Sequence, residues 1–99
     1  MMKLLMSWDI RSGREADYFE FAVKEFAPGL IRLGLQTSEV WYTLYGDCPQ
    51  MLTGCVAEDL PTIQSILKTD EWRELVMKLG EYVTDFQQKI VRATGNFQL

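Results

Sequence analysis

Hydrophobic and polar residues alternate along the first ten positions of the chain. An alternation with a period of two is typical of a strand, because successive side chains of a strand point to opposite faces. One face of residues 3–10 is fully apolar and carries Leu4, Met6, Trp8 and Ile10. The other face is mixed and carries Lys3, Leu5, Ser7 and Asp9. The pattern predicts a first strand in a sheet whose second side is partly covered.

From Glu15 the period changes to that of an amphipathic helix. The apolar residues that recur at three- and four-residue steps are Phe19, Ala22, Val23, Phe26 and Leu30. Ser12 and Glu15 have the spacing of a capping box at the start of this helix. Pro28 disfavours helical geometry at Ala27, so we expect a break or kink there.

Residues 39–57 have the pattern of a β-hairpin. Residues 39–45 are almost entirely β-branched or aromatic, residues 46–49 are turn formers, and a second β-rich run follows. Asp59 is then placed to cap a short helix. Thr69 or Asp70 caps the next helix, which the apolar period predicts from Glu71 to about Val83.

The last predicted element is a strand over residues 86–93, because Ile90 and Val91 are β-branched. The resulting order, βαββαβ, is that of the α+β ferredoxin-like fold, in which four antiparallel strands carry both helices on one face. We expect residues 1–99 to form one such domain.

The uncovered face of the sheet is too apolar to be left in water, and a second copy packed against it would cover it. The sequence therefore predicts a homodimer.

The chain resembles the dimeric α/β-barrel superfamily over nearly its whole length. The resembling features are residues 9–13 at the end of the first strand, the aromatic-rich first helix, residues 41–46, and above all residues 68–75. The resemblance implies a ferredoxin-like fold that dimerises through its sheet. Its relatives would include antibiotic-biosynthesis monooxygenases and stress-responsive proteins, with this chain in an uncharacterised branch.

Charge and composition exclude several partners. Ten basic and fourteen acidic residues give a net charge of −4, the wrong sign for wrapping a phosphate backbone, so we expect no nucleic-acid partner. The apolar run at the N-terminus is too short for an export signal or a membrane span. We expect a cytoplasmic protein without membrane contact, in which Cys48 and Cys55 stay reduced.

The chain contains no histidine. This absence excludes histidine general-base chemistry, Ser-His-Asp and Cys-His pairs, and the proximal histidine expected of the haem-binding relatives. Two cysteines without histidine do not make the usual zinc ligand set. We expect neither a metal nor a cofactor.

The candidate ligand residues are aromatic: an apolar pocket between helices and sheet would be lined by Trp8, Tyr18, Trp41 and Tyr45. Asp9 and Arg92 are the candidate catalytic groups, because each lies within a predicted strand. The alternatives are core packing for the aromatics or, for Trp41 and Tyr45, a place in the dimer interface. For Asp9 or Arg92 the alternative is an ordinary salt bridge or a solvated position.

Residues 11–14 carry two arginines at a helix start and are a further candidate for holding a phosphate or carboxylate, with a solvated turn as the alternative. The sequence thus supports two functions. One is a homodimer that binds a small hydrophobic or aromatic molecule and that acts, if it is an enzyme, as a cofactor-independent monooxygenase or isomerase. The other is a non-enzymatic ligand-sensing or dimerisation module. A pocket of roughly 300 Å³ or more with a convergent polar group favours ligand binding.

Overall fold

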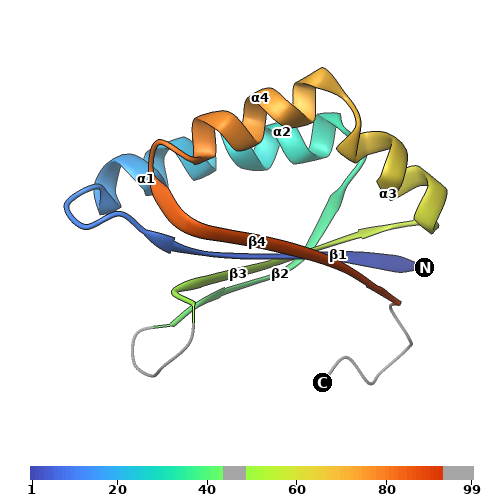
Figure 1. The fold of residues 1–99 in the computed structure, drawn as a ribbon, viewed down its shortest axis with the longest axis horizontal. Coiled ribbons are helices and arrows are strands. Elements are labelled where there is room, and N and C mark those ends of the chain that lie inside the picture. Colours follow the sequence, from blue (N-terminus) through green and yellow to red (C-terminus); the bar gives the residue numbers. More distant parts are fainter. Residues whose placement is uncertain (44–48, 93–99) are drawn as a thin grey trace.

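The computed structural model describes residues 1–43 and 49–92, which form an antiparallel sheet with a layer of helices on one side (Figure 1). The elements follow in the order β1 (Met2–Ile10), α1 (Glu15–Phe21), η1 (Ala22–Phe26), α2 (Ala27–Arg32), β2 (Gln36–Tyr42), β3 (Met51–Ala57), α3 (Leu60–Leu67), α4 (Asp70–Leu79) and β4 (Val83–Arg92). The strand order in the sheet is β2-β3-β1-β4, and each neighbouring pair is antiparallel. The predicted α+β, ferredoxin-like fold is confirmed.

The first helical run passes through Pro28 without ending, so of the break or kink predicted at Ala27 the break is wrong, and a π-helical segment, η1, directly precedes that residue instead. Proline has no N–H to donate, and its ring crowds the carbonyl four residues earlier. The chain accommodates it with η1, a π-helical segment in which the amide of Ala27 donates to the carbonyl of Ala22, five residues back. This wider turn ends at Phe26, two positions before the proline.

The π-helical segment also changes which side chains of this helix face the sheet. The buried ones are Tyr18, Phe21, Phe26 and Leu30. The step from Phe21 to Phe26 is five residues, because the turn between them holds one residue more than an α-helical turn. Phe19 and Val23, which a regular period places on the apolar side, are 40% and 72% exposed. Their predicted place on the buried stripe is wrong for this reason.

The predicted caps of the second helical region are confirmed. Asp59 Oδ1 accepts a hydrogen bond of 2.9 Å from the amide of Thr62. Thr69 Oγ1 accepts one of 3.1 Å from the amide of Trp72. Each bond satisfies an amide that has no partner within its own helix, and together they fix where α3 and α4 begin.

β4 begins earlier than the pattern predicts. α4 ends at Leu79, and β4 starts at Val83 rather than near Phe86. The ladder between β1 and β4 contains a bulge, where Asp85 and Phe86 both lie opposite Trp8. Asp85 has a φ of 56°, in the left-handed region that Asp tolerates better than most residues. Because of the extra residue, Val83 and Phe86 both pack against the core although they are three positions apart. A strict period of two would place them on opposite faces of the sheet.

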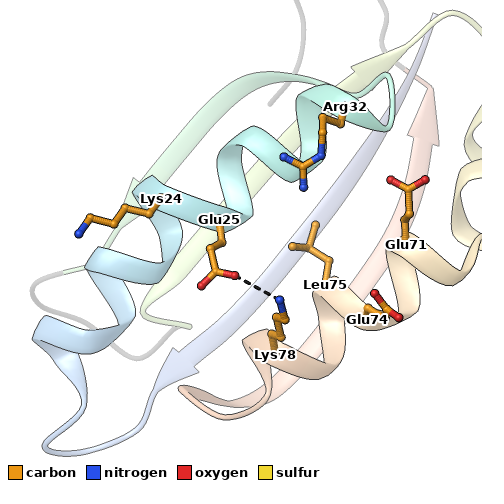
Figure 2. A pocket seen from close by; sticks show the side chains of 7 residues that line it. All are labelled: Lys24, Glu25, Arg32, Glu71, Glu74, Leu75 and Lys78. Carbon is orange, nitrogen blue, oxygen red and sulfur yellow. Dashed lines mark hydrogen bonds and ion pairs between the residues drawn. The ribbon is translucent and has the colours of Figure 1, made fainter.

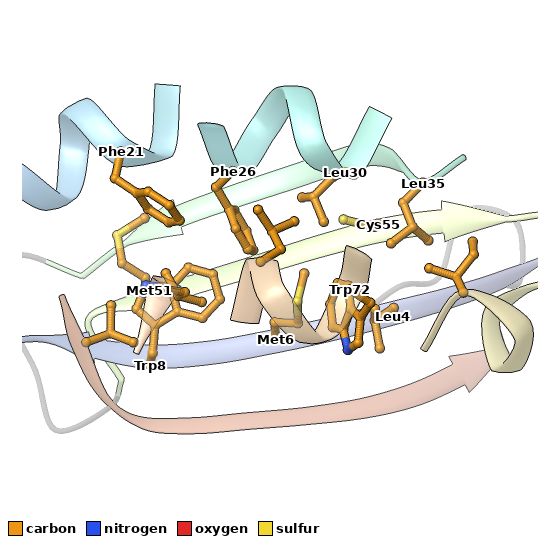
Figure 3. Packing of buried hydrophobic residues seen from close by; sticks show 14 of the residues in the cluster. Leu4, Met6, Trp8, Phe21, Phe26, Leu30, Leu35, Met51, Cys55 and Trp72 are labelled. Atoms are coloured by element: carbon orange, nitrogen blue, oxygen red, sulfur yellow. The ribbon is translucent and has the colours of Figure 1, made fainter. Parts of the chain in front are cut away.

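Trp8 belongs to a core that lies between the sheet and the helices (Figure 3). Its side chain is 1% exposed. The indole ring stacks on Phe86 at 5.9 Å and meets Phe26 edge to face at 5.7 Å. Its Nε1 donates a hydrogen bond of 3.1 Å to the hydroxyl of Tyr18. Aromatic side chains therefore fill this part of the interior, and the polar atom of the indole is satisfied.

Candidate functional site

The side of the sheet away from the helices, called the helix-free face below, is made by the strand positions that alternate with the core. Its apolar members are Leu5, Trp41, Leu52, Val56 and Val91. Trp41 is 60% exposed and lies directly opposite Leu52, which is 37% exposed. An apolar surface with an exposed tryptophan therefore lies on the side that the helices leave uncovered.

An ion pair between Lys3 and Glu39 spans the helix-free face. Lys3 Nζ lies 2.7 Å from Glu39 Oε1, and the Lys3 side chain is 8% exposed. Gly54 leaves the room for it, because a Cβ at that position would lie 2.7 Å from Glu39 Oε1 and 2.9 Å from Glu39 Cγ. The hydrogen bond from Lys3 holds the pKa of the Glu39 carboxyl below its usual range.

We expect Glu39→Gln to lower the free energy of unfolding by about 1–2 kcal/mol near neutral pH, because it removes the carboxylate that faces a largely buried ammonium. A carboxyl whose pKa is lower in the folded state stabilises above its unfolded pKa, and this contribution is lost as the pH falls through the folded value. Urea unfolding of both proteins, from neutral pH into acid, should show the difference between them narrowing.

The matched control is Glu20→Gln, whose carboxylate pairs with Lys24 at 3.1 Å while both side chains are more than half exposed. An exposed pair of this kind contributes about 0.5 kcal/mol or less. A difference for Glu39→Gln that does not change with pH would show that the charge of Glu39 does not contribute to the effect.

Asp9 is joined to the residue that precedes β3. The amide of Gln50 donates to Asp9 Oδ1 at 3.0 Å, and Gln50 Oε1 accepts from the amide of Ile10 at 2.7 Å. These reciprocal bonds fasten the end of β1 to the start of β3. The arrangement is a structural role for Asp9, and a catalytic role for it stays a prediction.

Among the described residues, the other predicted site residues do not meet at one point of the chain. Trp8 and Tyr18 come together in the core, where burial raises the pKa of the Tyr18 phenol and keeps it protonated. Trp41 lies on the opposite side of the sheet. Arg92 is exposed at the far end of β4, and Tyr45 lies outside the described residues. Their roles in ligand binding or catalysis stay predictions.

An open hollow of about 370 Å³ lies between α4 and the start of β4, and is called the α4–β4 hollow below. Its apolar lining consists of Val76, Leu79, Val83 and Phe86. Its polar lining consists of Arg11, Thr84 and Asp85. The hollow therefore combines an apolar wall with groups that can bind a polar or charged substituent.

Arg11 reaches the α4–β4 hollow from the end of β1. Its Nε and Nη2 donate to the carbonyl of Gly80 at 3.4 and 3.0 Å, and its amide donates to the carbonyl of Tyr82 at 2.8 Å. The sequence places Arg11 in a turn before a helix, beside Arg14, and gives no signal that it faces the other end of the chain. Only the pairing of β1 with β4 brings it there.

A smaller hollow of about 190 Å³ separates the first helical run from α4 (Figure 2). Charged side chains of both signs surround Leu75, and Lys78 Nζ pairs with Glu25 Oε1 at 3.3 Å. Gly29 lets the helices approach, since a Cβ there would lie 3.0 Å from Leu75 Cδ2. Mixed charges on an exposed helix contact are typical of a solvated surface. Side chains of both signs line this hollow, so its charge does not point to one class of ligand.

Several other predicted features bear on chemistry. Cys55 is buried, and burial raises its pKa to about 11, so its thiol is protonated at neutral pH and is not a nucleophile. Cys48 lies outside the described residues.

Within residues 1–43 and 49–92, no three acidic, cysteine or histidine side chains are grouped as a metal site requires. In those same ranges no helix has the length and apolar character needed to cross a bilayer.

No family model matches the chain, and a search of curated proteins found no similar sequence. Solved structures do match. A proposed antibiotic biosynthesis monooxygenase from Deinococcus radiodurans aligns with a TM-score of 0.75 at 16% identity, over 100% of this chain and 98% of that chain. A NIPSNAP-like domain protein from Burkholderia xenovorans gives 0.73 at 19% identity, over 96% and 86%.

A third match is a dimeric protein of unknown function from Bacteroides fragilis, which has a ferredoxin-like fold. It aligns with a TM-score of 0.64 at 10% identity, over 93% of this chain and 95% of that chain. Identities this low establish the fold and leave the chemistry open. The chain thus has the ferredoxin-like α+β fold of these proteins, as its resemblance to the dimeric α/β-barrel superfamily implies.

Proposed function

We propose that this protein is a homodimer in which the helix-free faces of two sheets pack together, and that each subunit binds a small hydrophobic molecule in the α4–β4 hollow. The observation that carries the proposal is the exposure of Trp41 beside Leu52 on a face without helices. A large aromatic side chain in an apolar surface is typical of the centre of a protein interface.

The composition of the helix-free face supports self-association. Leu5 and Val56 are only half-buried in one subunit, and the charges of Lys3 and Glu39 are already paired with each other. A two-fold interface buries the same surface on both copies, so one apolar face is sufficient for a stable contact. The Bacteroides fragilis protein that shares the fold is described as dimeric.

The size and lining of the α4–β4 hollow support the ligand. Its volume of about 370 Å³ lies within the range of small-molecule sites, roughly 300–1,000 Å³, and polar groups border its apolar wall. The enzymatic form of the proposal is a cofactor-independent monooxygenase or isomerase. It draws support only from the fold shared with the proposed monooxygenase of Deinococcus radiodurans.

The second candidate is a non-enzymatic dimerisation module, and the packed interior favours it. The space around Trp8, where the sequence predicts a ligand pocket, is filled by Tyr18, Phe26 and Phe86. If the protein is such a module, these aromatic residues stabilise the fold of the subunit and bind no small molecule. The cytoplasmic location and the lack of a nucleic-acid partner stay predictions that rest on the sequence.

Light scattering at micromolar concentration should give twice the 11.5 kDa mass of the chain. The physical reason is that a monomer leaves the apolar helix-free face in water, which costs free energy in proportion to the apolar area. A monomeric mass at every concentration up to millimolar would contradict the homodimer.

A further inference from the structure

We propose that the α4–β4 hollow selects apolar molecules that carry a carboxylate, and that Arg11 binds this group. The inference rests on the proposed ligand site and adds the chemical class of the ligand. It is carried by the position of Arg11, which brings a fixed positive charge to the edge of an apolar wall.

The guanidinium of Arg11 is held in place before any ligand arrives. Two of its N–H groups donate to the carbonyl of Gly80, at the turn between α4 and β4. A guanidinium has five N–H donors, so three remain. A donor that is already oriented loses little entropy on binding, and planar N–H pairs fit a carboxylate better than a single point charge does.

Arg11 also lacks a counter-ion in the described part of the chain. The five ion pairs among those residues involve other side chains. Asp85 lines the same hollow, yet its carboxylate does not lie within 4.0 Å of the guanidinium. A carboxylate on a ligand would supply the missing charge, while its apolar part covers Val76, Leu79 and Phe86.

The effect of substituting Asp85 tests the sign of the charge on the ligand. Asp85 carries the same charge as the ligand, so its removal should strengthen the binding of an anion. If the ligand were a cation, removal of Asp85 should weaken its binding. If it were a zwitterion, its binding should need both Arg11 and Asp85. Asp85→Asn is a conservative change, because Asn also tolerates the left-handed backbone that this position needs.

The probes are octanoate, octanol and octylamine, which share one apolar chain and differ only in the head group, measured by isothermal titration calorimetry. We expect octanoate to bind the native protein more tightly than the other two. Arg11→Gln should weaken octanoate about tenfold or more, since a charge-assisted hydrogen bond is lost. Asp85→Asn should strengthen it a few-fold, and neither change should alter the binding of octanol.

Two further variants separate charge from structure. Arg73→Gln removes the same charge from α4, at an exposed position away from the hollow, and should leave octanoate binding unchanged. Arg11→Lys keeps the charge without the planar donors and should retain part of the affinity. Circular dichroism of each variant checks that the fold is intact.

Val76→Phe narrows the hollow and distinguishes failure of the ligand class from failure of the site. If it abolishes the binding of octanol and octanoate while Arg11→Gln has no effect, the site stands and the carboxylate class is overturned. If Val76→Phe leaves octanoate binding intact, both proposals are overturned. The carboxylate class is also overturned if octanoate fails to bind the native protein, or if Asp85→Asn weakens its binding.

Discussion

Trp8→Ala should lower the free energy of unfolding by about 3–5 kcal/mol, the largest change in stability that we expect from a single substitution. The side chain is 1% exposed and contacts Phe26 and Phe86, so its removal leaves a cavity that close-packed neighbours cannot fill. The hydroxyl of Tyr18 loses its donor as well. Small domains have about 5–15 kcal/mol of stability in total, so this loss is a large fraction of it.

Urea unfolding followed by circular dichroism measures the effect, at one fixed protein concentration because the proposed dimerisation would add to apparent stability. Trp8→Phe is the milder variant. It keeps a ring but loses the indole N–H that donates to Tyr18, and should cost about 1–2 kcal/mol. Met77→Ala, at a position 74% exposed, should stay within about 0.5 kcal/mol of the native protein. A similarly small effect for Trp8→Ala would contradict its place in the core.

The order of elements was predictable because strands and helices impose different periods on the same apolar residues. The alternation in residues 3–10 placed Leu4, Met6 and Trp8 on one face, and all three are buried. Local side-chain chemistry was equally informative at α3 and α4, where Asp59 and Thr69 form the caps. These features depend on neighbouring residues alone, so one sequence is enough to predict them.

Features that depend on one irregular residue were not predictable in this way. The π-helical segment shifts the buried stripe by one position, and nothing in a regular period indicates it. The capping box predicted at Ser12 and Glu15 is absent, because the residue at the N-cap of α1 is Arg14, which makes no side-chain cap. Gly13 has a φ of 83°, and the turn that it allows places the helix start two residues later than Ser12.

The candidate site was less predictable than the fold, because it depends on register and on segments far apart in sequence. In β2, a shift of one residue exchanges the two faces, so Val40 and Trp41 were equal candidates for the side away from the helices. The irregular pairing between Thr37 and Glu39 decides the outcome. The α4–β4 hollow joins Arg11 to residues about seventy positions later, a proximity that no local pattern contains.

Trp41→Ser should raise the dissociation constant of the proposed homodimer by about 30-fold or more, since truncating an aromatic anchor residue of an interface costs roughly 2 kcal/mol or more. In one subunit this side chain is 60% exposed, so its removal leaves the fold of the monomer almost unaffected. Sedimentation velocity over a range of concentrations gives the dissociation constants of both proteins. Unfolding curves at low concentration check that the variant subunit is folded.

Val40→Ser is the matched control, because Val40 neighbours Trp41 in β2, is 57% exposed, and points to the helix side of the sheet. If two copies meet through the helix-free face, this change should leave the dissociation constant within about twofold of the native value, as expected for a surface substitution of about 0.5 kcal/mol or less. Equal weakening by both variants would mean that the partner binds the edge of β2. A native dimer unaffected by Trp41→Ser would remove the helix-free face from the interface.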